Sequence, residues 1–152
     1  MITILDPAAL AGLVGRFGAI RPDAPRRWGT LTAAEMLCHL ADATDWVQGR
    51  TNPPGLSFPT RSHWTKWVAL YTPIPWPRGY RTRPGFDPRL EGTKPDEFER
   101  DRRRTIESLT ALAATPAGRL APAHMTFGPM AQKDWGRWAW RHGDYHLRQF
   151  GG

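Results

Sequence analysis

The sequence predicts an all-α fold in which four amphipathic helices pack into a bundle. Four segments of the 152-residue chain carry apolar residues at the i, i+3, i+4, i+7 spacing of one helix face. Residues typical of helix caps or helix ends border these segments, and no segment shows the alternating pattern of a convincing strand. The length suits a single domain, so we expect one four-helix domain over residues 1–152.

The first two helices are predicted from their start signals. An Asp-Pro pair supplies an N-cap and a first helical residue, and the apolar stripe after it predicts a helix over residues 7–17 that ends at Gly18. Thr32 and Glu35 match a capping box, which satisfies backbone N–H groups at a helix start. The second helix is therefore expected to run from there to about Gln48.

A long connection separates the second predicted helix from the third. Residues 50–93 hold eight of the fifteen prolines together with many aromatic side chains, too many for a flexible linker. We expect this stretch to be ordered and to cover the bundle, with a short helix over residues 60–71. A third long helix begins within residues 93–96 and ends before Pro116, and the last helix spans about 131–149.

Composition limits the classes of function and environment. The net charge is +7 and 18 of the 21 basic residues are arginine, but they are scattered, and residues 102–104 form the only run. This distribution does not favour nucleic-acid binding. No apolar run is long enough to cross a membrane, and the N-terminus lacks a signal-peptide pattern, so we expect a cytoplasmic protein. Cys38 is the single cysteine, which excludes an internal disulfide and multi-cysteine zinc sites.

Three histidines form the candidate site. His142 and His146 are four residues apart on the last helix and share a face with Trp135 and Trp138, so they are expected to point inward. Alone, such a pair is often one exposed and one core histidine. His39, however, lies in the middle of the apolar stripe of the second helix. Inward histidines on facing helices predict a metal site with open coordination positions.

Several motifs resemble a branch of the DinB/YfiT-like superfamily whose function is unknown. Residues 135–151 are similar to its closing motif, His-x-x-His-His-Leu-Arg-Gln-Phe-Gly preceded by Trp-Gly. Residues 28–40 resemble the entry to its second helix, and residues 75–79 resemble its proline-rich middle. Residues 124–128 stand where the branch has His-Pro-x-Phe-Gly. The similar segments follow the family order over nearly the whole chain.

The resemblance implies a DinB-like four-helix bundle with a divalent metal ion, Zn²⁺ or Ni²⁺, on His39, His142 and His146. Characterised members of the family include thiol-dependent S-transferases and a thiol-dependent maleylpyruvate isomerase, and others are described as metal-dependent hydrolases. It therefore implies an enzyme that activates a low-molecular-weight thiol or water for a small-molecule substrate. The alternatives are a non-catalytic bundle and a nucleic-acid-binding module. The family and the spare tryptophans also favour a homodimer.

Other residues are candidates for supporting roles. Asp42 and Asp144 could accept the second N–H of a ligand imidazole. His124 could orient the site or cap the last helix, and Tyr145 could supply a proton. Two of these positions depart from the family pattern, since Tyr145 stands where the branch often has a histidine and Met125 replaces the proline after His124.

Arginines are the candidates for substrate binding. Arg148 on the last helix could clamp a substrate carboxylate, and so could Arg78 or Arg81 in the proline-rich connection. The sequence does not choose among them.

Overall fold

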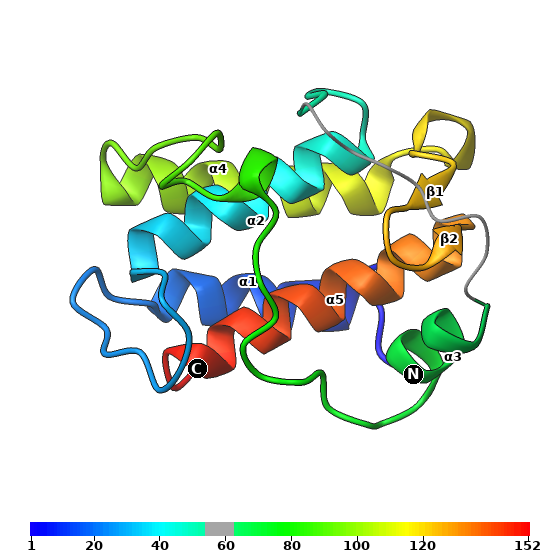
Figure 1. Cartoon of the computed structure of the whole chain (residues 1–152), viewed down its shortest axis with the longest axis horizontal. Coiled ribbons are helices and arrows are strands. Elements are labelled where there is room, and N and C mark those ends of the chain that lie inside the picture. Colours follow the sequence, from blue (N-terminus) through cyan, green and yellow to red (C-terminus); the bar gives the residue numbers. More distant parts are fainter. Residues whose placement is uncertain (54–62) are drawn as a thin grey trace.

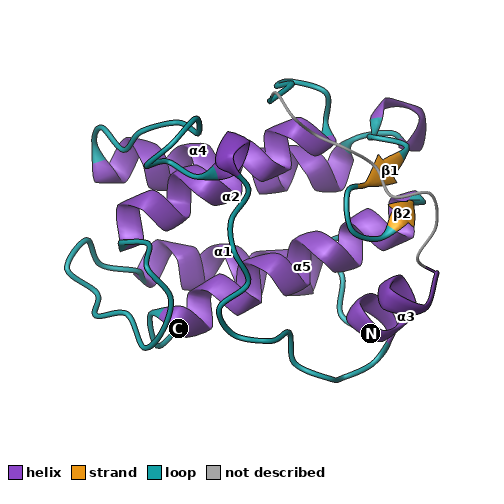
Figure 2. Cartoon of the chain, in the orientation of Figure 1, coloured by secondary structure: helices purple, strands orange, loops and turns teal. Residues whose placement is uncertain are grey.

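A computed structural model describes residues 1–53 and 63–152, and this part of the chain is mostly helical (Figure 2). The all-α prediction is confirmed. Two two-residue strands form a hairpin that the sequence did not predict. The helices are α1 (Pro7–Ala19), α2 (Ala33–Val47), α3 (His63–Tyr71), α4 (Phe98–Ala114) and α5 (Gln132–Gln149), and the shorter elements are η1 (Pro84–Phe86), η2 (Ala117–Arg119), β1 (Ala123–His124) and β2 (Gly128–Pro129).

The four long helices lie in two layers, α2 with α4 and α1 with α5 (Figure 1). Contacts of α1 with α4 and of α2 with α5 join the layers. One apolar cluster lies between them and draws on every long helix, with Phe17, Met36, Leu109, Trp135 and Leu147 among its fully buried members. The face of α2 that carries the candidate histidine is therefore turned toward α5.

Both predicted helix starts are confirmed. The Asp6 carboxylate accepts a backbone N–H from the first turn of α1 at 3.0 Å. The N–H of Glu35 donates to Thr32 Oγ1 at 3.2 Å, and the N–H of Thr32 donates back to Glu35 Oε2 at 2.7 Å. The predicted end of α1 at Gly18 is wrong, because this glycine adopts helical geometry and the helix continues to Ala19.

Residues 72–93, which we call the strap, cross from α3 to α4 over the helix layers (Figure 1). Phe86 of the strap is buried, and residues 54–62 of the stretch predicted to be ordered lie outside the described residues. The expected short helix is α3, and residues 60–62 of that prediction lie outside the described residues. The expectation that the aromatic side chains of this region bury themselves is wrong in part. Trp64 is 74% exposed and Trp67 is 51% exposed, and their rings stack on each other at the surface.

Polar side chains connect α2 to α4 inside the fold. Arg104 of α4 bridges two α2 carboxylates, with its Nη2 at 2.7 Å from Asp42 and 2.9 Å from Asp45. Ser108 donates to the same Asp45 at 2.6 Å. This pairing fixes the rotation of α2 and so the direction of its histidine. Among the described helices, none combines the length and the apolar character needed to span a bilayer.

Candidate metal centre

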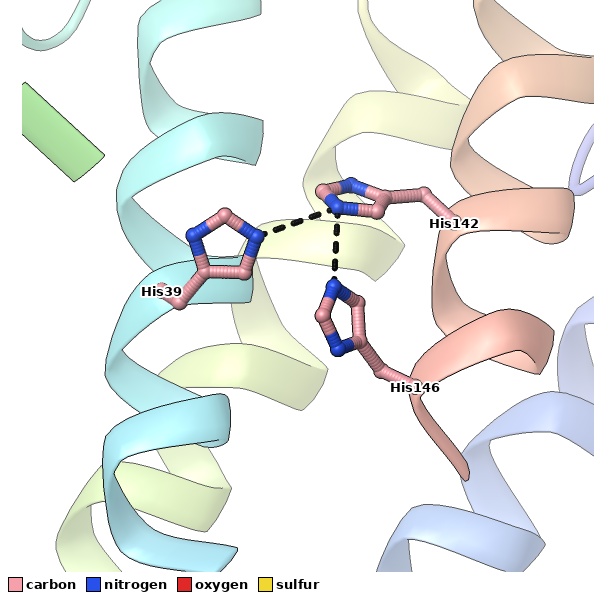
Figure 3. Close-up of side chains that lie close together, drawn as sticks. All are labelled: His39, His142 and His146. Atoms are coloured by element: carbon pink, nitrogen blue, oxygen red, sulfur yellow. Dashed lines mark hydrogen bonds between the residues drawn. The ribbon is translucent and has the colours of Figure 1, made fainter. Parts of the chain in front are cut away.

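The three predicted histidines converge in the structure. His39 comes from the middle of α2, and His142 and His146 come from consecutive turns of α5, so all three rings face one point between the layers (Figure 3). One ligand atom from each histidine lies within 4.8 Å of the others. The helix periodicity that placed these residues on inner faces is therefore confirmed as geometry.

The spacing of the ring nitrogens suits one metal ion. His142 Nε2 lies 3.1 Å from His39 Nε2 and 3.2 Å from His146 Nε2. Two imidazole nitrogens bound to one zinc ion at about 2.0–2.1 Å, with ligand angles between octahedral and tetrahedral, lie about 2.9–3.4 Å apart. These two pairs fall within that interval, and all three ligand nitrogens lie within 4.8 Å of one another.

The far nitrogens of two rings show which of their atoms carry hydrogen, whereas His142 Nδ1 is buried and has no hydrogen-bond partner among the described residues. His39 Nδ1 lies 2.9 Å from the Phe86 carbonyl oxygen, and His146 Nδ1 lies 2.6 Å from Gln149 Oε1. Both oxygens accept, so each Nδ1 donates and each neutral ring turns an Nε2 lone pair toward His142. One proton on His142 Nε2 could serve only one of these lone pairs. A metal ion would serve all three rings, which is why these residues fit one.

Burial keeps these imidazoles neutral at ordinary pH. It lowers the pKa of His146 to about 3 and holds the pKa of His142 well below its usual value, and the neighbouring histidines add to both effects. The pKa of His39 is also lowered by burial, although the Phe86 carbonyl and nearby carboxylates oppose the shift. Neutral imidazole is the form that binds metal ions, so the site is ready for a metal without losing protons.

Aromatic rings from α5 and the strap pack against the cluster. Trp138 packs at 4.8 Å from the His142 ring, Trp76 of the strap at 6.1 Å from the same ring, and Tyr145 at 5.2 Å from the His146 ring. Trp76 and Tyr145 also line a surface cavity of about 270 Å³. His142 is itself only partly buried, and its ring contacts Trp76, which lines this cavity.

The two carboxylates that were expected to accept N–H groups of the histidines bind other residues. Asp42 accepts hydrogen bonds from the strap and from Arg104, and Asp144 is held by Arg16 at 2.9 Å and Arg148 at 3.0 Å. Neither carboxylate hydrogen-bonds to a described histidine, so these predictions are wrong. Each carboxylate is bound by arginine instead, Asp42 by Arg104 and Asp144 by Arg16 and Arg148. Charge-assisted hydrogen bonds of this kind are strong.

His124 and Tyr145 also differ from their expected roles. His124 Nδ1 accepts the Thr126 N–H at 3.0 Å within the hairpin, and it neither hydrogen-bonds to the three histidines nor caps α5. The Tyr145 hydroxyl lies 3.4 Å from the Pro77 carbonyl oxygen, while the edge of its ring packs against His146. Tyr145 is therefore one of the aromatic rings that pack against the cluster, and within the described chain its hydroxyl forms no hydrogen bond with the three histidines.

The supporting groups that the structure does provide were missed. Gln149 lies three residues after His146, and this helical spacing was a signal that it could reach the ring. The Phe86 carbonyl had no such signal, since it is 47 residues from His39 in sequence and belongs to the irregular strap. Cys38 is a buried, protonated thiol whose pKa burial raises to about 12.

The substrate-binding candidates separate clearly. Arg148 is bound to Asp144 on the same helix, which occupies its guanidinium. Arg78 instead lies over the ring of Trp28, with 4.4 Å from its guanidinium carbon to the ring centroid. Arg81 forms no ion pair with the described residues.

Comparisons of the chain with protein-family models, with curated proteins and with solved structures found no match.

Proposed function

We propose that this chain is a DinB-like metalloprotein whose four long helices form the bundle of that family. His39, His142 and His146 then hold one divalent ion, Zn²⁺ or Ni²⁺. The proposal rests mainly on one observation: the Nε2 lone pairs of His39 and His146 both point at Nε2 of His142. A single proton on His142 Nε2 can form a hydrogen bond with only one of them. The order of the family-like motifs along the chain supports it as well.

The chain supplies the setting for this ion. When bound, a divalent ion provides a Lewis acid that lowers the pKa of a thiol or a water molecule in an open coordination position. The Phe86 carbonyl and Gln149 fix the tautomer and direction of two ligand rings. Trp76, Trp138 and Tyr145 exclude bulk water, which strengthens electrostatic effects at the site.

The reaction we infer is the activation of a low-molecular-weight thiol, or of water, for attack on a small-molecule substrate. Three histidines from two helices leave part of the coordination sphere free for such a group. The thiol rests on the family resemblance, and water is the second nucleophile that a site of this kind activates. The products would be those of a thiol S-transferase or of a hydrolase, respectively.

Cobalt substitution tests whether the site is open. The protein is loaded with Co²⁺, and 2-mercaptoethanol is added while the absorption spectrum is recorded. The proposal predicts a new sulfur-to-cobalt charge-transfer band in the wild type and none in His142→Ala. If the absorption spectrum of the cobalt-loaded wild type changes neither with added thiol nor with pH, the metal has no exchangeable coordination position. The catalytic proposal would then be wrong. Thiol-transfer and ester-hydrolysis assays on the zinc and nickel forms distinguish the two reactions.

A further inference from the structure

The strap carries positive charge that no carboxylate neutralises. Its residues 73–86 include Arg78, Arg81 and Arg83 and no acidic residue. Eight other arginines form ion pairs within the described part of the chain, whereas these three form none there. Arg78 is the one that lies closest to a defined partner, the ring of Trp28.

Trp28 connects Arg78 to the histidine cluster. It belongs to the loop before α2, and the edge of its ring packs against Tyr145 at 6.2 Å. Tyr145 in turn packs against His146 at 5.2 Å. The guanidinium therefore lies two rings from the proposed metal ligands.

The indole of Trp28 has an unused donor. Its Nε1–H is buried and has no acceptor among the described residues. A buried N–H without a partner costs about 1–3 kcal/mol, so an acceptor here would be favourable. Stacking holds the neighbouring guanidinium without using its in-plane N–H groups. Because Arg78 is exposed, its side chain can shift to admit an acceptor beside the indole.

Local charge favours an anion as that acceptor. Arg78 places a positive charge beside the Trp28 indole, and no described carboxylate forms an ion pair with Arg78, Arg81 or Arg83. The carboxylates nearest the cluster, Asp42, Asp87 and Asp144, are each already bound to an arginine elsewhere. A planar carboxylate matches donors of this geometry.

We propose that Arg78 and the Nε1–H of Trp28 bind a carboxylate, and that the substrate of this protein is a carboxylate-bearing small molecule. The identification of this ligand as a substrate rests on the proposed function. The anion site itself requires no metal ion, so the two proposals can be tested separately.

The test uses metal-free, ¹⁵N-labelled full-length protein and succinate as the probe. The Trp28 indole signal is assigned by its loss in Trp28→Phe. Titration at constant ionic strength should shift this signal downfield and saturate, whereas the neutral analogue succinamide should leave it unmoved. Arg78→Ala should weaken succinate binding by about tenfold or more, since it removes a charge-assisted pair. Arg103→Ala, which removes an exposed arginine from α4, should bind as the wild type does.

Each outcome has a defined meaning. The anion site is wrong if the Trp28 signal ignores succinate, if succinamide shifts it equally, or if Arg103→Ala weakens binding as much as Arg78→Ala. Arg78→Lys should restore part of the affinity, because it returns the charge without the planar fork. A protein that binds succinate at Trp28 but takes up no metal would overturn the proposed function and leave the anion site standing. A protein that binds metal and ignores succinate would do the reverse.

Discussion

Replacing Gln149 by leucine tests how α5 holds a proposed metal ligand. Gln149 and His146 are each 6% exposed, and Gln149 Oε1 lies 2.6 Å from His146 Nδ1. Leucine has a similar volume but no acceptor. The imidazole N–H would then stay buried without a partner, and the ring would lose the contact that directs its Nε2 toward the cluster.

Two effects of different size follow from that contact. An unpaired buried donor costs about 1–3 kcal/mol, which should appear as a lower free energy of unfolding in the metal-free protein. Loss of the group that orients a metal-bound imidazole typically weakens metal affinity 10–100-fold. The second effect corresponds to about 1.4–2.7 kcal/mol of metal-binding free energy.

The assay is competition for Zn²⁺ with a colorimetric chelator, together with urea unfolding of each variant. Gln132→Leu is the matched control, because Gln132 also makes one side-chain hydrogen bond, in which it donates to the Thr115 carbonyl at 3.0 Å. It should lose stability and keep its zinc affinity. Gln149→Glu keeps an acceptor and should bind zinc at least as tightly as the wild type. A folded Gln149→Leu protein with wild-type zinc affinity would refute the role given to Gln149.

Three further substitutions probe the surroundings of the site. Gly29→Ala should destabilise the protein by about 1–2 kcal/mol and weaken metal binding, since Gly29 has φ +79° and a Cβ there would lie 2.5 Å from the Gln149 amide nitrogen; urea unfolding and zinc competition measure both. Burial lowers the pKa of His124 from 6.5 to about 3, so the unfolded chain binds the extra proton between those values. The free energy of unfolding should therefore fall as pH drops through that window, by up to about 1.4 kcal/mol per pH unit for this residue. His124→Asn should reduce that slope in metal-free urea titrations, and an unchanged slope would contradict the assignment. Arg104→Ala leaves the Asp42 carboxylate without its cation and should cost roughly 1–3 kcal/mol by urea unfolding, the partial exposure of the arginine keeping the loss moderate.

The helices and the convergence of the histidines were predictable because both depend on local periodicity. Capping at Asp6 and Thr32 uses residues within one turn, and the same i, i+4 rule that defines an inner face places His142 above His146. His39 could be added because it interrupts an apolar stripe that has to face the core. None of these inferences needs knowledge of how distant segments pair.

The partners of the histidines were not predictable because distant segments choose them. Asp42 is three residues from His39 in sequence, yet Arg104 of another helix binds it. The carbonyl that does hold His39 belongs to Phe86, whose place depends on the path of an irregular, proline-rich strap. Periodicity also fails for Trp64, because a helical stripe shows that side chains share a face without showing whether that face meets the core.

The most direct test of the three-histidine metal site is the metal-to-protein ratio after loading. Wild-type protein, His142→Ala and His63→Ala are incubated with excess Zn²⁺, and in separate samples with Ni²⁺ or Co²⁺, then separated from free ion by gel filtration and analysed by elemental mass spectrometry. His63, at the start of α3, is the matched histidine outside the cluster. A single site on His39, His142 and His146 predicts one zinc per chain in the wild type and in His63→Ala, and none in folded His142→Ala. A wild type that retains no zinc, nickel or cobalt, or a His142→Ala variant that retains as much as the wild type, would contradict it.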